Sequence, residues 1–168
     1  GDNASFKEGS FLPIMFEGDG ANLIVSSAIA NGRFAVYRFD LSLGKMTDKI
    51  FEHPTVDIWD LEVSADNKKL LAVTYWEDRL KRHFLDAEYE KTLSAIEAAL
   101  PKRNNQVLSQ TLDGRYWMLK SSSDKYPGVV YLFDALTKEL EAIEEINEHL
   151  NPKLLSPVSM LRYYARDG

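Results

Sequence analysis

Residues 111–119 read Thr-Leu-Asp-Gly-Arg-Tyr-Trp-Met-Leu, and this stretch decides the fold of the chain. The Asp113-Gly114 pair is typical of a tight turn, because Asp bonds to nearby backbone N–H groups and Gly accepts a positive φ. The apolar run at 116–119 that follows is typical of a strand covered on both faces. The stretch therefore predicts a turn that leads into a buried β-strand.

This turn and strand are repeated along the chain. The turn aspartates, 47 residues apart in both steps, are Asp19, Asp66 and Asp113. The aspartates that close the next strand, 46 and 48 residues apart, are Asp40, Asp86 and Asp134. Two parallel series in the same apolar context indicate an internal repeat. We expect all six aspartates to bond to turns and strand ends, rather than to act as the carboxylate pair of a glycosidase.

Each repeat predicts four antiparallel strands. A short strand precedes each Asp turn, two follow it, and tight turns at 43–45 and 136–138 lead into an outer strand. Four antiparallel strands per unit of this length are typical of a β-propeller blade. We therefore predict a mainly β chain, a partial propeller of about three four-stranded blades. The expected units are about 11–53, 54–101 and 102–150, followed by a linker at 151–168.

The second unit departs from the pattern after its third strand. Asp86 is a suitable N-cap for a helix over about 87–100. Its apolar stripe has helical spacing and consists of Tyr89, Leu93, Ile96 and Leu100. We expect one helix inserted after the second blade, either packed on the blade or used to recognise a partner. The stretch 138–150 fits either a helix or a strand, and the repeat favours a strand over at least 139–144.

Composition excludes several classes of protein. The 168 residues carry 20 basic and 26 acidic side chains, a net charge of −6, so nucleic acid is not an expected partner. The chain has no cysteine, which excludes thiolate catalysis and fits either a cytoplasmic or an exported bacterial protein. No apolar run approaches the roughly 18 residues that span a bilayer, so we expect no membrane span.

The sequence also lacks the common catalytic patterns. None of the nine glycines is followed by another four positions later, so there is no Gly-x-Ser-x-Gly nucleophile elbow. The three histidines show no metal-binding spacing, and we expect His83 to be a packed or inter-blade residue. We therefore expect no catalytic residue, no metal and no cofactor in this chain.

The connection between the middle strands of the second unit has the most function-like composition. It reads Trp76-Glu77-Asp78-Arg79, an aromatic side chain beside mixed charges. These residues are candidates for gating substrate access or for docking on a neighbouring domain, and the alternative is a salt-bridged loop without substrate contact. The equivalent connection in the third unit is expected to be a loop over 121–128, in which Pro127 and Gly128 set the backbone geometry.

Longer stretches of the chain carry a family resemblance. They read Tyr-Trp-Glu-Asp-Arg-Leu-Lys-Arg-His-Phe-Leu-Asp at 75–86, Ala-Leu-Pro at 99–101, Ser-Ser-Asp-Lys-Tyr-Pro-Gly at 122–128, Tyr-Leu-Phe-Asp at 131–134 and Tyr-Tyr-Ala-Arg-Asp-Gly at 163–168. In this order they resemble the propeller of bacterial acylaminoacyl-peptidase-like members of the prolyl oligopeptidase family. The resemblance covers nearly the whole chain and is best from Tyr37 onward.

The resemblance implies a function for the longer protein. In this family a stretch like 165–168 marks the passage from the last blade into the α/β-hydrolase domain, which carries the serine nucleophile and its partners. The chain is then expected to be a non-catalytic fragment that docks on its own hydrolase domain and limits access of peptide substrates. Three blades cannot close a ring of 4 to 8, so we also expect self-association through open sheet edges.

Two other functions stay open at this point. The first is a stand-alone propeller-like adaptor that binds protein partners. The second is a free-standing hydrolase that uses carboxylates. The coding sequence on either side of the chain discriminates the first from a peptidase fragment, and an assay against glycosides tests the second.

Overall fold

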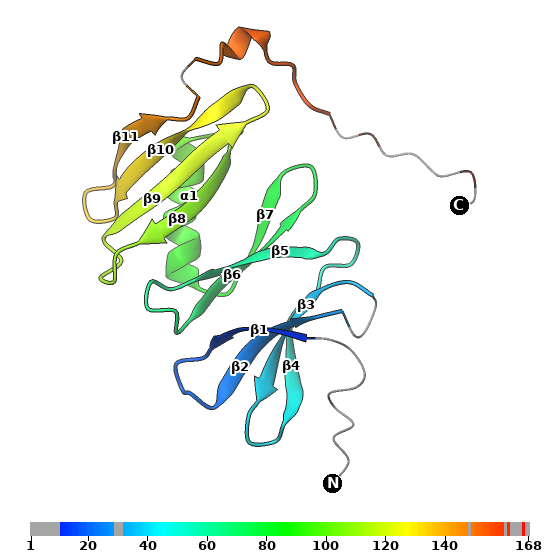
Figure 1. Cartoon of the computed structure of the whole chain (residues 1–168). Helices are drawn as coiled ribbons and strands as arrows, with labels where there is room; N and C mark the ends of the chain where they lie inside the picture. Colours follow the sequence, from blue (N-terminus) through cyan, green and yellow to red (C-terminus); the bar gives the residue numbers. More distant parts are fainter. Residues whose placement is uncertain (1–10, 29–31, 148, 160, 162–165, 167–168) are drawn as a thin grey trace.

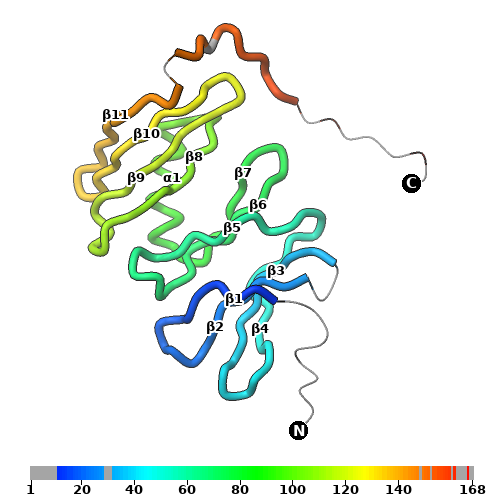
Figure 2. The backbone as a smooth tube through the Cα atoms, viewed as in Figure 1, coloured from blue at the N-terminus to red at the C-terminus, as the bar shows by residue number. Residues whose placement is uncertain are grey.

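The computed structural model describes residues 11–28, 32–147, 149–159, 161 and 166. It confirms the expected fold class, because three antiparallel sheets of four, three and four strands follow one another along the chain (Figure 1). One α-helix lies within the described residues, directly after the second sheet. Figure 2 shows that the three sheets do not close into a ring.

The first sheet is a meander in the order β1-β2-β3-β4. Its strands are β1 (Phe11–Phe16), β2 (Asn22–Ser27), β3 (Ala35–Asp40) and β4 (Lys45–Phe51). The two middle strands are the most buried, and Ile24, Val25 and Val36 are fully inaccessible to solvent.

The second sheet has the order β5-β6-β7 and ends in the helix α1 where the other sheets have a fourth strand. Its elements are β5 (Ile58–Val63), β6 (Leu70–Trp76), β7 (Leu80–Phe84) and α1 (Ala87–Ala99). Asp86 caps the helix, since its carboxylate accepts the N–H of Tyr89 at 2.7 Å.

The third sheet repeats the four-stranded meander. Its strands are β8 (Asn104–Gln110), β9 (Tyr116–Ser123), β10 (Tyr126–Asp134) and β11 (Glu139–Glu145), and the short 3-10 helix η2 (Pro152–Leu154) follows them. β11 confirms the strand expected over 139–144. Of the linker expected at 151–168, residues 160, 162–165, 167 and 168 lie outside the described residues.

The prediction of a loop over 121–128 is wrong. β9 continues to Ser123 and β10 begins at Tyr126, so only two residues form the turn. Gly128 lies inside β10 with φ +131°, and a Cβ there would lie 3.3 Å from the Ser121 carbonyl oxygen. The glycine therefore marks a close backbone approach at an irregularity in strand pairing, which the sequence pattern does not separate from a loop.

Two apolar clusters hold the sheets together. The cluster between the first and second sheets contains Met15, Ile24, Val36, Leu70 and Val73. The larger cluster joins the second sheet, α1 and the third sheet, and its buried members are Leu71, Ala72, Tyr89, Leu93, Ile96, Trp117, Leu119 and Phe133. Because the apolar stripe of α1 is buried in this cluster, α1 is a packing helix rather than an exposed recognition helix.

A buried guanidinium ties the same elements together. The side chain of Arg82 on β7 is only 3% exposed. Its Nε donates to both carboxylate oxygens of Glu62 on β5 at 2.8 and 2.9 Å, and one terminal nitrogen donates to the Asn105 carbonyl oxygen on β8 at 2.6 Å. Its other terminal nitrogen pairs with Glu97 on α1 at 3.2 Å. From β7, one side chain thus contacts three other elements, β5, β8 and α1.

We expect Arg82→Met to lower the free energy of unfolding by about 3 kcal/mol, because it leaves the half-buried Glu62 carboxylate without its counter-ion. The matched control is Arg115→Met, because Arg115 pairs with Asp134 at 3.0 Å at a more exposed site. That change is expected to cost less than about 1 kcal/mol. Urea unfolding followed by circular dichroism measures both, and equal losses would contradict a special role for Arg82.

Candidate functional site

The site with the best-defined shape is a groove of about 480 Å³ between the second and third sheets. One wall is formed by β5 and the end of β6, the other by β8, and Tyr89 of α1 lies between them. Its lining includes Trp59, Asp60, Glu62, Trp76 and Tyr89. We call this hollow the inter-sheet groove.

Strand register places the residues of one wall on the same face. Asp60 pairs with Thr74 and Glu62 pairs with Ala72 across β5 and β6. Because directly opposite residues of an antiparallel pair point to the same face, both carboxylates share a face with Thr74, and Trp76 follows two residues later on that face. This is the face on which Arg82 reaches β8, so it is turned toward the third sheet.

An aromatic pair forms one end of the inter-sheet groove. Trp59 lies in an irregularity of the β5–β6 pairing, between the pairs made by Ile58 and Asp60. Its ring meets Trp76 edge to face, with centroids 6.4 Å apart. Trp59 is 67% exposed and Trp76 is 40% exposed. Two large aromatic rings held together at a surface provide a contact area that folding alone does not require.

The two carboxylates of the groove differ in their partners. Glu62 forms an ion pair with the buried Arg82 guanidinium. Asp60 accepts the N–H of Leu61 at 2.8 Å and makes no ion pair within the described part of the chain. The inter-sheet groove therefore carries one carboxylate whose charge no neighbouring cation neutralises.

Tyr89 forms a rigid part of the groove. It is 4% exposed and its ring stacks on Trp117 with centroids 5.2 Å apart. Its hydroxyl makes no hydrogen bond of ordinary geometry among the described residues. Burial, together with the nearby Glu62 carboxylate, raises the pKa of the Tyr89 phenol far above its ordinary value.

The four residues predicted from the sequence are only partly brought together. Trp76 ends β6 and lines the inter-sheet groove, while the three residues after it form the connection to β7. Glu77 lies 3.7 Å from the His53 ring and Asp78 lies 3.8 Å from Lys81. Arg79 is exposed, and its carbonyl oxygen accepts the N–H of Glu77 at 3.1 Å. Only Trp76 of this group belongs to the groove.

Two of the three histidines, His53 and His83, contact neighbouring aromatic rings. His83 stacks on Phe51 of the first sheet with ring centroids 4.4 Å apart, which agrees with an inter-blade residue. The His53 ring lies 4.4 Å from Tyr75, and its Nδ1 accepts the N–H groups of Thr55 and Val56. Within the described ranges, no three His, Asp or Glu side chains are grouped as metal ligands.

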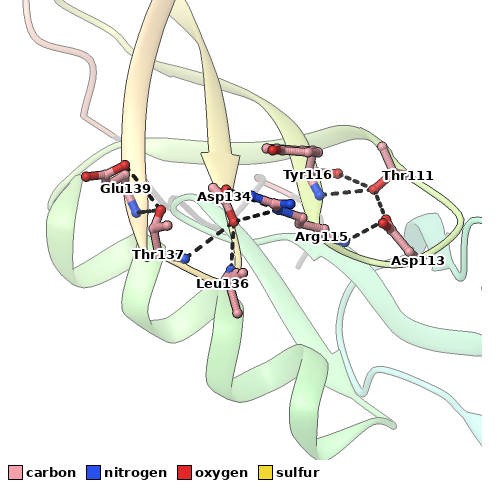
Figure 3. A network of polar contacts seen from close by, with 8 residues as sticks. All are labelled: Thr111, Asp113, Arg115, Tyr116, Asp134, Leu136, Thr137 and Glu139. Carbon is pink, nitrogen blue, oxygen red and sulfur yellow. Dashed lines mark hydrogen bonds and ion pairs between the residues drawn. The ribbon is translucent and has the colours of Figure 1, made fainter.

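The six repeated aspartates lie at turns and strand ends. Each accepts at least one backbone N–H, and these are Asp19, Asp40, Asp66, Asp86, Asp113 and Asp134. Hydrogen bonds from these and neighbouring side-chain donors lower the pKa of all six carboxyl groups. In the third sheet Arg115 joins the two turns by pairing with Asp134, while Asp113 bonds to Thr111 (Figure 3). These carboxylates therefore stabilise turns and strand ends.

A second hollow, of about 790 Å³, lies between the turns of the first and second sheets and is more open. Some of its charged side chains form ion pairs. Arg38 bonds to Glu17 at 2.6 Å and to Asp48 at 2.8 Å, and Lys69 pairs with Asp86. Because it is more open than the inter-sheet groove, this hollow is a weaker candidate for binding.

Sequence reasoning missed Trp59, Asp60 and Tyr89 as members of a site. Tyr89 is recognisable only as part of an apolar helical stripe, and Asp60 only as a polar residue of an alternating strand. Trp59 carries a weak signal, a large aromatic residue next to an acid in a short strand. Their proximity to Trp76 depends on how β5 pairs with β6 and on how β8 lies against them.

Comparison with models of known protein families and with curated proteins found no match to this chain. Among the helices of the described residues, none is long and apolar enough to cross a bilayer.

We expect Tyr89→Phe to leave stability nearly unchanged at pH 7 and to increase it relative to the parent chain above pH 10. The phenol is neutral in the folded state but ionises in the unfolded chain near pH 10, so folding stability is present below that pH and is lost as pH rises. At pH 11 the variant should be more stable by about 1 kcal/mol. Urea unfolding at pH 7 and pH 11 tests this, and an equal difference at both values would contradict it.

Proposed function

We propose that the chain forms non-catalytic blades of the propeller of a serine peptidase that resembles acylaminoacyl peptidases of the prolyl oligopeptidase family. In the longer protein it docks on the α/β-hydrolase domain and limits which peptides reach the serine. In this proposal the nucleophile, the general base and the oxyanion hole come from the hydrolase domain. Cleavage of short or acylated peptides belongs to the hydrolase domain.

The observation that carries this proposal is the succession of similar antiparallel sheets with an aspartate at the same turns. Sheets one and three are four-stranded meanders, and the second has three strands and a helix. This architecture fits consecutive propeller blades. The order of the motifs at 75–86, 122–128 and 163–168 adds the resemblance to the peptidase family.

The inter-sheet groove supports a role in substrate selection. It lies beside the strands that begin the second and third sheets, β5 and β8, and these are edge strands of their sheets. In a closed propeller the strands at one edge of every blade surround a central channel. Trp59 and Trp76 would then meet a peptide that passes along this side of the blades.

The alternative is a stand-alone adaptor that binds protein partners. The exposed Trp59–Trp76 pair is the observation that favours it, because exposed aromatic residues are enriched in protein interfaces. It differs from the peptidase proposal in requiring no hydrolase domain.

The peptidase proposal is tested on the longest protein encoded by the reading frame that contains this chain, with the 168-residue chain alone as control. We expect the longer protein to react with a fluorophosphonate probe and to cleave acetyl-alanine p-nitroanilide. The chain alone should do neither. A reading frame without a nucleophile elbow, or a longer protein that stays unlabelled, would exclude the peptidase and leave the adaptor.

We also expect the isolated chain to self-associate through β1. Among the described strands β1 pairs only with β2, and it exposes Leu12, Ile14 and Phe16 by 58, 43 and 60%. An apolar edge strand without charge is prone to pair with another copy. β11 is also an edge strand, but its four glutamates would repel those of a second copy and so disfavour pairing.

Sedimentation velocity should show a species larger than a monomer, and Ile14→Lys should shift it toward the monomer. Ile143→Lys is the matched control, because Ile143 is 54% exposed on the acidic edge strand β11. A monodisperse monomer for the unmodified chain would contradict the prediction, and so would equal effects of the two variants.

A further inference from the structure

The charge inside the inter-sheet groove selects a class of ligand. Its lining contains two acidic side chains, Asp60 and Glu62, and no lysine or arginine. Glu62 is neutralised by Arg82, which is almost fully buried behind it. The remaining negative charge is that of Asp60. A ligand that carries a positive charge complements this lining, and an acidic one does not.

The aromatic end of the groove suits the same ligand. Trp59 and Trp76 meet edge to face and both remain exposed, so ring faces are available to solvent. A guanidinium or ammonium group is attracted to the face of an indole ring, which is the strongest partner among the aromatic side chains. Trp59 lies at the irregularity in the β5–β6 pairing, and both Trp59 and Asp60 line the groove.

The Asp60 carboxylate is arranged to receive a donor from the ligand. It accepts one bond, from the N–H of Leu61 at 2.8 Å, and makes no other hydrogen bond among the described residues. A carboxylate has two oxygens and several acceptor positions, so capacity for a cation remains. The same bond occupies the Leu61 N–H at the free edge of β5. Addition of a peptide strand to β5 is therefore opposed at this position, and recognition through a side chain is favoured.

The groove is largely preformed. Tyr89 is fixed by stacking on Trp117, and the wall behind it is held by the contacts of Arg82 with Glu62 and the Asn105 carbonyl oxygen. A preformed site loses little conformational entropy when it binds a ligand. A weak interaction with a single side chain is then measurable.

We propose that the inter-sheet groove binds the lysine or arginine side chain of an extended peptide. The cationic group lies against Trp59 and Trp76 and pairs with the Asp60 carboxylate. This inference rests on the proposed function, which it deepens by naming basic peptides as the class that the propeller side of the enzyme favours. The binding site belongs to this chain and needs no hydrolase domain.

The test uses the 168-residue chain and three blocked pentapeptides, Ac-Gly-Ala-X-Ala-Gly-NH2, in which X is arginine, norleucine or glutamate. Binding is followed by tryptophan fluorescence and by calorimetry at low salt. We expect saturable binding of the arginine peptide, at least roughly five-fold weaker binding of the norleucine peptide and no binding of the glutamate peptide. Binding of the arginine peptide should weaken as salt rises.

Two variants locate the site. Asp60→Asn removes the charge and Trp59→Ala removes one ring, and each should weaken binding of the arginine peptide roughly five-fold. Asp78→Asn is the matched control, because Asp78 is an exposed acid on the neighbouring connection but does not line the groove. It should leave binding unchanged. Far-UV circular dichroism checks that each variant keeps the fold.

Several outcomes would overturn the inference. They are the absence of binding, equal binding of the arginine and norleucine peptides, or equal effects of Asp60→Asn and Asp78→Asn. These results concern the isolated chain and leave fluorophosphonate labelling of the longer protein untouched. Conversely, an unlabelled longer protein with intact arginine binding would exclude the peptidase and keep the groove as a site for basic peptides.

Discussion

The arrangement of the second and third sheets depends on one buried guanidinium. Arg82 contacts β5, α1 and β8 from its position on β7, so the relative placement of these elements is tied to a single side chain. A charge in this environment is tolerated only because Glu62 and the Asn105 carbonyl oxygen satisfy its donors. The inter-sheet groove lies beside this contact and takes its shape from it. Local stability and the candidate binding site thus share the same residues.

The helix α1 explains why the groove lies between these two sheets. It stands where a fourth strand occurs in the other sheets, and its stripe of Tyr89, Leu93 and Ile96 is buried in the cluster that joins the second and third sheets. No helix separates β4 of the first sheet from β5 of the second, and these two sheets pack through a smaller apolar cluster. The hollow between them is more open than the inter-sheet groove. The inserted helix therefore distinguishes the contact beside the candidate groove from the contact between the first and second sheets.

Acidic side chains have two distinct roles in this molecule. The aspartates of the repeat accept hydrogen bonds from side chains and from backbone N–H groups at turns, and these bonds lower their pKa. They therefore stabilise the fold at neutral pH and lose that contribution as pH falls through their lowered pKa. Asp60 lies in a strand, outside the repeat, and its charge faces the groove. The repeated aspartates therefore stabilise the fold, whereas Asp60, which is not part of the repeat, is the candidate for binding a ligand.

The sequence by itself determined the mainly β architecture, the three units, the turn at Asp113 and the helix after the second sheet. These features depend on local turn chemistry and hydrophobic period, which neighbouring residues carry. The outer strand β11 needed the repeat to be recognised, and the short turn before β10 was missed because glycine marks loops and strand irregularities alike. Only the tertiary structure decided that Trp59, Asp60 and Tyr89 share a groove with Trp76. Their proximity arises from strand register and sheet packing, and contacts between distant segments leave no periodic trace along the chain.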